Sequence, residues 1–380
     1  MSAREIAWRA RRTAAGGVGG LRSRRADPAA GYTERGWRDA LARFRVAESR
    51  PVLLERDRAR RIAALQPEMA AELVAAADRA AQMRFAYFGY PAVELPAPVD
   101  WNYDPVAGAR WPSSPATKID YRTATGDVKW IWELNRLQHL PWLSQAWLIT
   151  GDERYSTAAF HQLDTWLDQN PPGVGIAWRN AFEAGVRAIS IAVAVQGLRD
   201  CPELTVDRFR RVVEVLAASA TRCWVDRSRF SSANNHLVGE LAGLAVVAIL
   251  FPDLPGAGDW EHRAIAGLVT EADRQILADG SGAEQAVGYQ VFTVELLLVV
   301  VALLLERDGQ AAEPILEAID RSTAFLAAIV GQADPDPRYG DNDEGFALRL
   351  GPEPLGTSPS PCDAVVLGDE SAVAARLWPR

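Results

Sequence analysis

The stretch that decides the fold spans residues 150–200 and reads TGDERYSTAAFHQLDTWLDQNPPGVGIAWRNAFEAGVRAISIAVAVQGLRD. Its apolar residues recur with the helical period over 153–168 and again over 180–198, so it predicts two helices. A long loop, QNPPGVGIAWRN (169–180), joins these helices, and short turns flank them. Consecutive antiparallel helices form αα-hairpins where tight turns join them.

The same helical pattern continues on both sides of these two helices. Six further helices are predicted over 130–149, 206–224, 235–251, 259–278, 291–307 and 313–330, and the region 32–88 is also helical. At about 17–20 residues each, these helices would be about 25–30 Å long. Strand-like alternation is almost absent. The sequence therefore predicts an all-α fold, in which consecutive αα-hairpins close into a toroid or stack as a solenoid.

The connections between the helices alternate in character. Every second one is a short turn, whereas the others are long and polar, at 169–180, 226–236, 278–290 and 331–345. Alternate connections of an up-and-down array lie at the same end, so the long loops should converge on one rim. The proline-, glycine- and aromatic-rich segment 89–127 should lie on that rim as well. Loops on a rigid scaffold are where functional residues concentrate.

A length of 380 residues allows two or three domains and needs no disulfide or metal to stabilise a core. We expect one helical domain over 32–350, a basic arm over 1–31 and an irregular tail over 351–380. The arm carries seven arginines but no apolar segment of a secretory signal, which leaves the cytoplasm as the default location. A solvated tail or a short docking helix is expected, with contact to an anionic surface as the alternative.

Composition excludes several classes of function. A net charge of −8 and a pI near 5.3 argue against a nucleic-acid-binding protein. The longest apolar runs are shorter than the ~20 residues of a membrane span. Three scattered cysteines and four histidines indicate neither a disulfide framework nor a metal site, and we expect no cofactor. All but two of the 41 cations are arginine, which we attribute mainly to codon usage, although arginine also binds carboxylates bidentately.

The most informative motif is SSANNH, where the loop 226–236 becomes a helix. Asn234 and Asn235 are favoured as helix caps, and His236 could equally be a core residue. One asparagine would suffice for a cap, so the dense polar run also indicates a binding or catalytic site. Glu240 follows His236 by one helical turn and could orient its imidazole.

Three other segments combine polar and aromatic residues at a predicted rim. Each has a plainer interpretation: a packed tyrosine, a Glu183–Arg187 helix ion pair, or core tryptophans. The alternative is a site with aromatic platforms for sugar rings and guanidinium groups for their carboxylates. The candidates are Gln285, Tyr289 and Gln290, then Trp178, Arg179 and Arg187, and finally Trp132 and Arg136. The acidic run 341–344 lacks the spacing of an EF-hand and is expected to be a turn.

Together these segments resemble the helical N-terminal domain of the heparinase II/III-like and alginate-lyase-like polysaccharide lyases. The matching stretches are DVKWIWELNRLQHLPWLSQAWLITGDERY, NPPGVGIAWRNAFEAGVRAISI, SSANNHLVGELAGL, ILADGSGAEQAVGYQVF and RYGDNDEG. They occur in family order over roughly 101–351. The resemblance implies an incomplete (α/α) toroid whose cleft lies on the rim with the long loops.

The resemblance also implies β-elimination on an acidic, uronate-containing glycan. A base removes the C5 proton, the neighbouring carboxylate is neutralised, and an acid protonates the departing glycosidic oxygen. By motif, Asn235 corresponds to the carboxylate neutraliser and Tyr289 to the base or acid. His236 would assist, and Arg187 and Trp178 would contact the substrate.

Two departures from the family pattern leave alternatives open. The family commonly has Tyr-His where this chain has Tyr289-Gln290, and relatives continue into a C-terminal β-sandwich that supplies a catalytic histidine. The chain is therefore expected to be a lyase, a non-catalytic glycan-binding remnant, or half of a split lyase with its β-sandwich on a separate chain. A fourth possibility is an (α/α) glycoside hydrolase, with Glu183, Glu240 and Glu284 as candidate acids.

Overall fold

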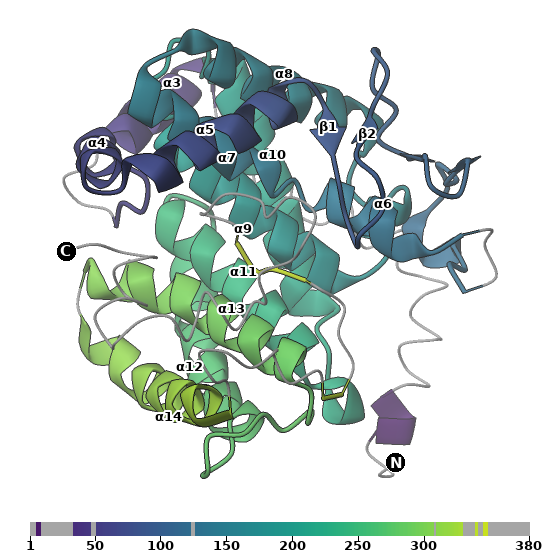
Figure 1. Cartoon of the computed structure of the whole chain (residues 1–380), viewed down its shortest axis with the longest axis vertical. Coiled ribbons are helices and arrows are strands. Elements are labelled where there is room, and N and C mark those ends of the chain that lie inside the picture. The colour runs from purple at the N-terminus through teal and green to yellow at the C-terminus, as the bar shows by residue number, and fades with distance from the viewer. Residues whose placement is uncertain are drawn as a thin grey trace.

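The helices and short strands of a computed structural model define the architecture (Figure 1). Structure is described for residues 5–8, 33–46, 51–122, 126–307, 309–329, 339–340 and 345–348. The α-helices are α3 (Glu34–Arg45), α4 (Arg56–Leu65), α5 (Pro67–Ala81), α6 (Val128–Asn135), α7 (His139–Thr150), α8 (Glu153–Gln169), α9 (Ala181–Gly197), α10 (Val206–Val225), α11 (Asn235–Leu250), α12 (Ala257–Gln275), α13 (Val287–Leu305) and α14 (Glu313–Ile329).

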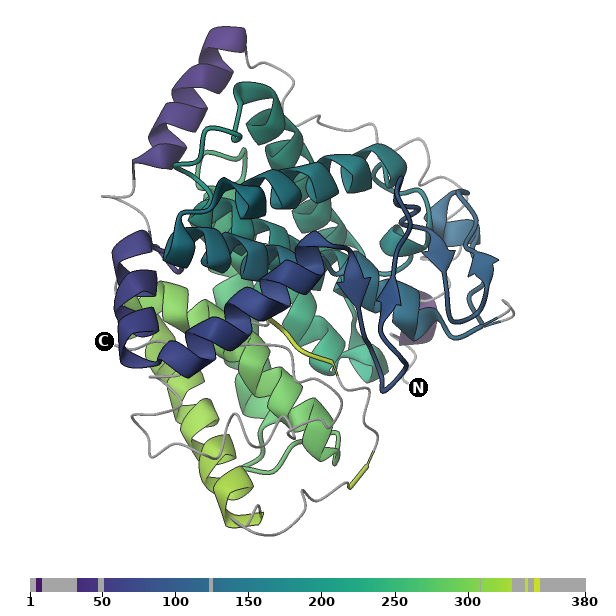
Figure 2. The ribbon, with the colours of Figure 1, turned by 45° about the horizontal axis from the view of Figure 1, so that its top comes forward.

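The helices form two layers, as an array of αα-hairpins requires. Nearly every residue of α7, α9 and α11 is buried, and each of these helices packs against the next, with α13 following α11. The helices α8, α10, α12 and α14 bury one face only and alternate with the inner ones along the chain. Figure 2 shows this curved double layer in a second view. The fold is the predicted all-α, incomplete (α/α) toroid.

One predicted helix is broken in two. The expected helix over 130–149 ends as α6, and α7 begins after Leu137, whose φ of +55° cannot continue a right-handed helix. Asn135 ends α6, and its side-chain amide donates to the carbonyl oxygens of Ile131 (2.8 Å) and Trp101 (3.0 Å). Its side-chain oxygen accepts from Trp166 Nε1 at 2.7 Å. The bonds to Trp101 and Trp166 are tertiary and hold the break, and helical periodicity alone does not reveal them.

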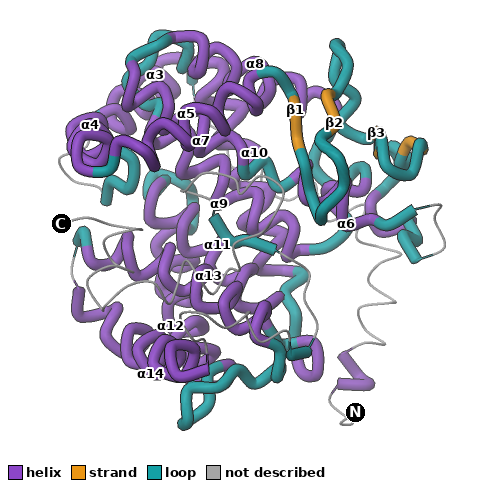
Figure 3. Tube along the Cα trace, viewed as in Figure 1, coloured by secondary structure: helices purple, strands orange, loops and turns teal. Residues whose placement is uncertain are grey.

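Short strands lie in the segment 89–127, where the sequence predicts only irregular structure, and just before it, at the end of the region 32–88 that is predicted to be helical (Figure 3). Strand β1 (Arg84–Phe85) pairs antiparallel with β2 (Val93–Glu94), and β3 (Tyr103–Asp104) pairs antiparallel with β4 (Ala109–Arg110). The buried Trp101 and Trp111 anchor the segment to the helices. The 3-10 helix η2 (Ala116–Lys118) then leads toward α6.

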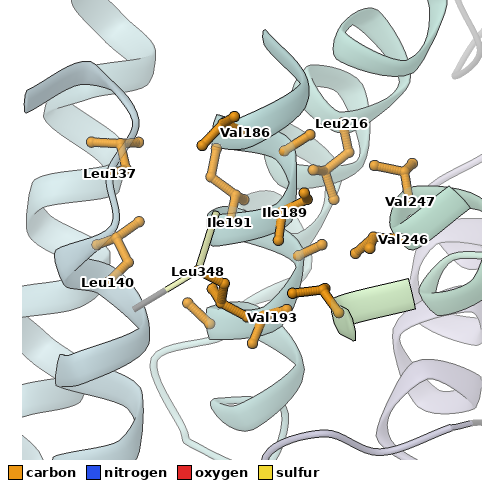
Figure 4. Packing of buried hydrophobic residues seen from close by; sticks show 14 of the residues in the cluster. Leu137, Leu140, Val186, Ile189, Ile191, Val193, Leu216, Val246, Val247 and Leu348 are labelled. Carbon is orange, nitrogen blue, oxygen red and sulfur yellow. The ribbon is translucent and has the colours of Figure 1, made fainter. Parts of the chain in front are cut away.

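The core lies between the inner helices (Figure 4). There α9 and α11 approach so closely that their backbones touch. A Cβ on Gly243 would lie 2.6 Å from Gly185 Cα, and a Cβ on Gly185 would lie 2.7 Å from the carbonyl oxygen of Gly239. Leu348 packs among Val193 and other core residues, so part of the chain beyond α14 crosses the inner layer.

Helix α13 is long and apolar enough to cross a membrane, by length and composition alone. Most of its residues are buried against α11, α14 and their neighbours. A helix that is apolar on all sides is typical of a protein core as well as of a membrane span. Packing within the toroid accounts for its composition.

Candidate functional site

The long loops before α11 and α13 meet on one rim of the toroid. Asn235 begins α11, and its side-chain nitrogen donates to Glu284 Oε1 of the loop before α13 at 2.8 Å. The fourth long loop joins the same place, because Val287 N donates to the carbonyl oxygen of Tyr339 at 3.1 Å. This convergence is what the alternation of the loops predicts.

The other two rim segments join from the side of α9. Arg179 precedes α9, and its Nε donates to the carbonyl oxygen of Ile119 in the segment 89–127 at 2.7 Å. The ring of Phe182, in the first turn of α9, lies 4.6 Å from that of His236 in α11 and 5.7 Å from that of Phe292 in α13. Three inner helices thus begin on one rim, where their partial positive charges favour an anion.

A carboxylate already occupies the beginning of α11. Glu284 Oε1 accepts from the backbone N–H of Asn235 (3.0 Å) and from its Nδ2 (2.8 Å), and Oε2 accepts from Asn235 Nδ2 and Asn234 Nδ2, both at 3.0 Å. Asn234 is also the N-cap, with Oδ1 accepting from His236 N at 3.1 Å. Asn234 is therefore the helix cap, and the neighbouring Asn235 remains the candidate site residue of the motif.

Sequence reasoning treats Glu284 only as a candidate hydrolase acid and misses its contact with Asn235. The available signal is weak: one acidic residue in a polar loop predicted to share a rim with Asn235. Neither periodicity nor spacing indicates that these two residues, 49 positions apart, share hydrogen bonds.

Tyr289, Gln285 and His236 lie on the same rim. Tyr289 is half-buried in the first turn of α13, which begins four residues earlier than the sequence predicts. Gln285 is exposed and has a φ of +51°. His236 is exposed on one side and lies against Phe182 on the other, with ring planes at 20°.

Glu240 is buried and ties the loop 226–236 to α11. Its carboxylate accepts from Ser228 N at 2.6 Å and from Ser228 Oγ at 3.1 Å. These bonds fix the path of the loop that leads into Asn234. Orientation of the His236 imidazole by Glu240 stays a prediction.

The expected platform of Trp178 and Arg187 lies in the interior, not on the rim. The Arg187 guanidinium is completely buried between the rings of Trp166 and Trp178, 4.8 Å from each centroid, and donates to the carbonyl oxygen of Ala177 at 2.9 Å. Burial lowers the pKa of Arg187 to about 10. Trp178 Nε1 donates to Asn170 O at 3.0 Å. Both side chains therefore shape the scaffold and have no free surface for a glycan.

Arg136 is bound to two carboxylates. Its guanidinium donates to both oxygens of Glu183, at 2.9 and 3.0 Å, and to Glu133 Oε2 at 2.6 Å. Burial alone lowers the pKa of Arg136, but the charges and hydrogen bonds of Glu183 and Glu133 outweigh it and raise the pKa. Glu183 therefore pairs with Arg136, which follows α6, and not with Arg187 of its own helix. Gly345 lies over this cluster, since a Cβ there would lie 3.6 Å from Arg136 Nη1.

Gln290, at the position where the family commonly has histidine, is buried and holds a turn. Its Oε1 accepts from Gly282 N at 2.9 Å, and its Nε2 donates to Gly280 O at 2.8 Å and Ser322 Oγ at 2.7 Å. Both polar atoms of the side chain are thus engaged in securing the turn that precedes Glu284.

Trp132 and Arg179 form a half-buried aromatic cluster on the rim with Tyr121, which sequence reasoning misses. The Tyr121 and Trp132 rings are 5.0 Å apart, edge to face, and the Arg179 guanidinium lies 5.5 Å from the Tyr121 centroid. Trp132 Nε1 donates to Ile176 O at 3.2 Å. The arrangement combines an apolar face with a guanidinium.

Part of the basic arm contacts this rim. Ser231 Oγ donates to Glu5 Oε1 at 2.5 Å, and the rings of Trp8 and Phe230 are 5.8 Å apart. Residues 5–8 form a helical turn. The tail 351–380 lies outside the described residues.

No group of three or more His, Cys, Asp or Glu side chains able to hold a metal ion occurs among the described residues. The acidic run 341–344, expected to be a turn, lies outside them. Cys201 and Cys223 are buried free thiols, and burial raises the pKa of Cys201 to about 12.

Residues 42–336 match the family model described as heparinase II/III N-terminus. Two curated relatives are heparin-sulfate lyases. That of Pedobacter heparinus is 22% identical over 230 residues, or 57% of this chain, and that of Bacteroides stercoris is 20% identical over 298 residues, or 70% of this chain. These matches cover only 34% and 40% of the relatives' own lengths.

Solved structures with a similar fold include a heparinase III, with a TM-score of 0.58 and 17% identity over 78% of this chain and 45% of the other. The heparan sulfate lyase of Pedobacter heparinus has a TM-score of 0.54 and 18% identity over 80% of this chain and 45% of the other. At this level of identity the likeness concerns the fold.

Proposed function

This chain belongs to the heparinase II/III N-terminus family, and we propose that it binds an acidic, uronate-containing polysaccharide on the rim of its toroid and cleaves it by β-elimination. The observation that carries the proposal is the carboxylate held at the beginning of α11. The amides of Asn234 and Asn235 and the backbone N–H of Asn235 converge there on the two oxygens of Glu284. The start of α11 therefore favours carboxylate groups, and we propose that a uronate carboxylate binds beside Glu284, at the amide of Asn235.

The chemistry needs a carboxylate neutraliser first. The C5 proton of a uronate lies α to its carboxylate, and removal of that proton places a second negative charge on the same group. A donor aimed at the carboxylate stabilises this developing charge. We assign this role to Asn235, whose donors lie at a helix start where an anion is favoured.

Tyr289 and His236 are the proton-transfer residues of the proposal. A base takes the C5 proton, the C4–O4 bond breaks as the C4–C5 double bond forms, and an acid delivers a proton to O4. Tyr289 has the role of base or acid, and His236 assists it. A tyrosine has an ordinary pKa of about 10, so a basic role requires nearby positive charge, which the starts of α11 and α13 provide in part.

The acidic character of the substrate is supported by a second region of the rim. The Arg179 guanidinium lies 5.5 Å from the Tyr121 centroid, beside Trp132, and its Nε donates to the carbonyl oxygen of Ile119. A sugar ring can lie on the aromatic face while the guanidinium binds its carboxylate or sulfate. We propose that this cluster holds a sugar next to the one that is cleaved.

Turnover tests the proposal directly. The protein is incubated with heparan sulfate, alginate or hyaluronan, and the new double bond is followed by ultraviolet absorbance. We expect product with at least one glycan, and about a hundredfold or greater loss for Tyr289→Phe and Asn235→Ala. Tyr90→Phe is the matched control, because Tyr90 is exposed on the segment between β1 and β2.

The same samples separate cleavage from binding. Calorimetry with acidic oligosaccharides reports binding without turnover, the result expected of a non-catalytic module. Turnover that appears only with an added β-sandwich chain indicates a split lyase. Neither binding nor product with any of the glycans contradicts the proposal.

A further inference from the structure

We infer that Glu284 is a positioning residue that fixes the amide of Asn235 so that an N–H, not the side-chain oxygen, faces the substrate carboxylate. This inference rests on the proposed function, in which Asn235 neutralises a uronate. It adds a residue that the sequence motifs do not assign to that role.

The need for positioning follows from the chemistry of an amide. The asparagine side chain carries an oxygen on one side and an NH2 group on the other, and rotation by 180° exchanges them. With the oxygen toward the substrate, Asn235 would repel a carboxylate. An ionised carboxylate can only accept hydrogen bonds, so contact with Glu284 selects the rotamer with the NH2 group on the Glu284 side.

The geometry leaves one N–H of Asn235 available. Its Nδ2 lies 2.8 Å from Glu284 Oε1 and 3.0 Å from Oε2. A nitrogen nearly equidistant from both oxygens directs one N–H between them, and the second N–H then points away from Glu284. Asn235 is buried apart from a small exposed fraction of 4%, so this second N–H is held in a defined direction.

Glu284 is itself held firmly enough to act as a guide. It also accepts from Asn234 Nδ2 and from the backbone N–H of Asn235. The turn just before it is tied to α13, because Gln290 bonds both Gly280 and Gly282. Gln290 of α13 therefore holds the turn, and the turn leads to Glu284, which binds the side-chain amide of Asn235 on α11.

If Glu284 instead competed with the substrate carboxylate, its removal would have the opposite effect. If its carboxylate merely occupied the place of a uronate, a substrate would have to displace it, and removing Glu284 would strengthen glycan binding. If it positions Asn235, removing it weakens the interaction with a substrate carboxylate. The two roles differ in sign.

The experiment compares Glu284→Ala, Glu284→Gln, Asn235→Ala and the double variant Asn235→Ala/Glu284→Ala. Each is assayed for kcat and KM on a uronate oligosaccharide and on its methyl ester, whose carboxyl group is uncharged. Glu317→Gln, an exposed carboxylate on α14, is the control, and thermal unfolding shows that each variant is folded.

We expect Glu284→Ala to lower kcat/KM on the free uronate about a hundredfold, as loss of a transition-state donor does, and to affect the methyl ester much less. For Glu284→Gln we expect a kcat/KM between those of the wild type and Glu284→Ala, since its amide has one accepting oxygen. In the Asn235→Ala background, Glu284→Ala should not lower kcat/KM further, because Glu284 acts through Asn235.

Equal losses on both substrates, additive losses in the double variant, or tighter binding by Glu284→Ala would each overturn the inference. Wild-type protein that neither binds nor cleaves any uronate glycan would instead overturn the proposed function, and the inference with it. Active wild type with fully active Glu284→Ala overturns the inference alone.

Discussion

The ring of Phe182 supports the imidazole of His236, with centroids 4.6 Å apart and planes at 20°. The space for this contact comes from Gly239, one helical turn after His236. A Cβ at Gly239 would lie 2.6 Å from Phe182 Cε2. The glycine of the SSANNHLVGE motif therefore keeps an aromatic ring beneath a candidate site residue.

Gly239→Ala should displace the Phe182 ring and leave His236 unsupported. We expect turnover to fall at least about tenfold, because small displacements of catalytic groups are costly, and the free energy of unfolding to fall by about 1–3 kcal/mol through overpacking. Gly258→Ala is the control, since a Cβ there meets nothing within 4 Å. Unchanged turnover in Gly239→Ala would contradict a supporting role for Phe182. Urea unfolding and the absorbance assay measure the two effects.

The sequence predicts the array of helices because each hairpin carries its own periodicity and its own loops. The same alternation of loops predicts the rim, and contacts such as Val287 N to Tyr339 O confirm it. Amphipathic helices such as α10 also reveal which face is buried. The fold was therefore accessible from local pattern.

Side-chain direction on α9 was not accessible in this way. All of its residues are buried, so periodicity does not distinguish the face toward the rim from the face toward Trp166. Arg187 consequently appeared as a surface guanidinium, whereas it is a core residue. Glu183 could be assigned to Arg187 four residues later, but its partner is Arg136, 47 residues earlier. Pairs formed by tertiary packing leave no local signal.

Arg187 should influence stability, with no specific effect on glycan binding. Arg187→Met keeps most of the volume between Trp166 and Trp178 and removes a buried charge, so we expect a free energy of unfolding unchanged or raised by about 1–4 kcal/mol. Arg187→Ala should lower it by about 2–5 kcal/mol through the cavity it leaves. Urea unfolding measures both. Loss of glycan binding in a fully stable Arg187→Met protein would contradict the core assignment.

Gln290 should be required for the turn before Glu284. Gln290→Glu has the same shape and can still accept from Gly282 N, but its carboxylate faces the carbonyl oxygen of Gly280 without a donor. We expect the free energy of unfolding to fall by about 1–3 kcal/mol. Turnover should fall as well, since the turn leads into Glu284. Gln66→Glu, at an exposed position between α4 and α5, is the control. Wild-type stability of Gln290→Glu would contradict this role.

His139 should make stability depend on pH below neutrality. It is 2% exposed, packed beside Phe85 and Trp101, and burial lowers its pKa from 6.5 to about 3. As the pH falls from 6.5 toward 3, the unfolded chain binds a proton at this residue and the folded protein does not. The free energy of unfolding therefore falls with decreasing pH, by up to about 1.4 kcal/mol per unit, and the effect is absent above 6.5. Between pH 7.5 and 5.0 this contribution amounts to about 2 kcal/mol.

His139→Phe should remove that contribution, because phenylalanine fits among aromatic neighbours and does not titrate. Urea unfolding of both proteins at pH 7.5 and 5.0 measures the difference: the wild type should lose about 2 kcal/mol more than the variant. His262→Gln is the control for the replacement of a histidine, since His262 is exposed on α12. Identical pH slopes for wild type and His139→Phe would show that the buried imidazole takes up its proton in the folded state as readily as in the unfolded chain.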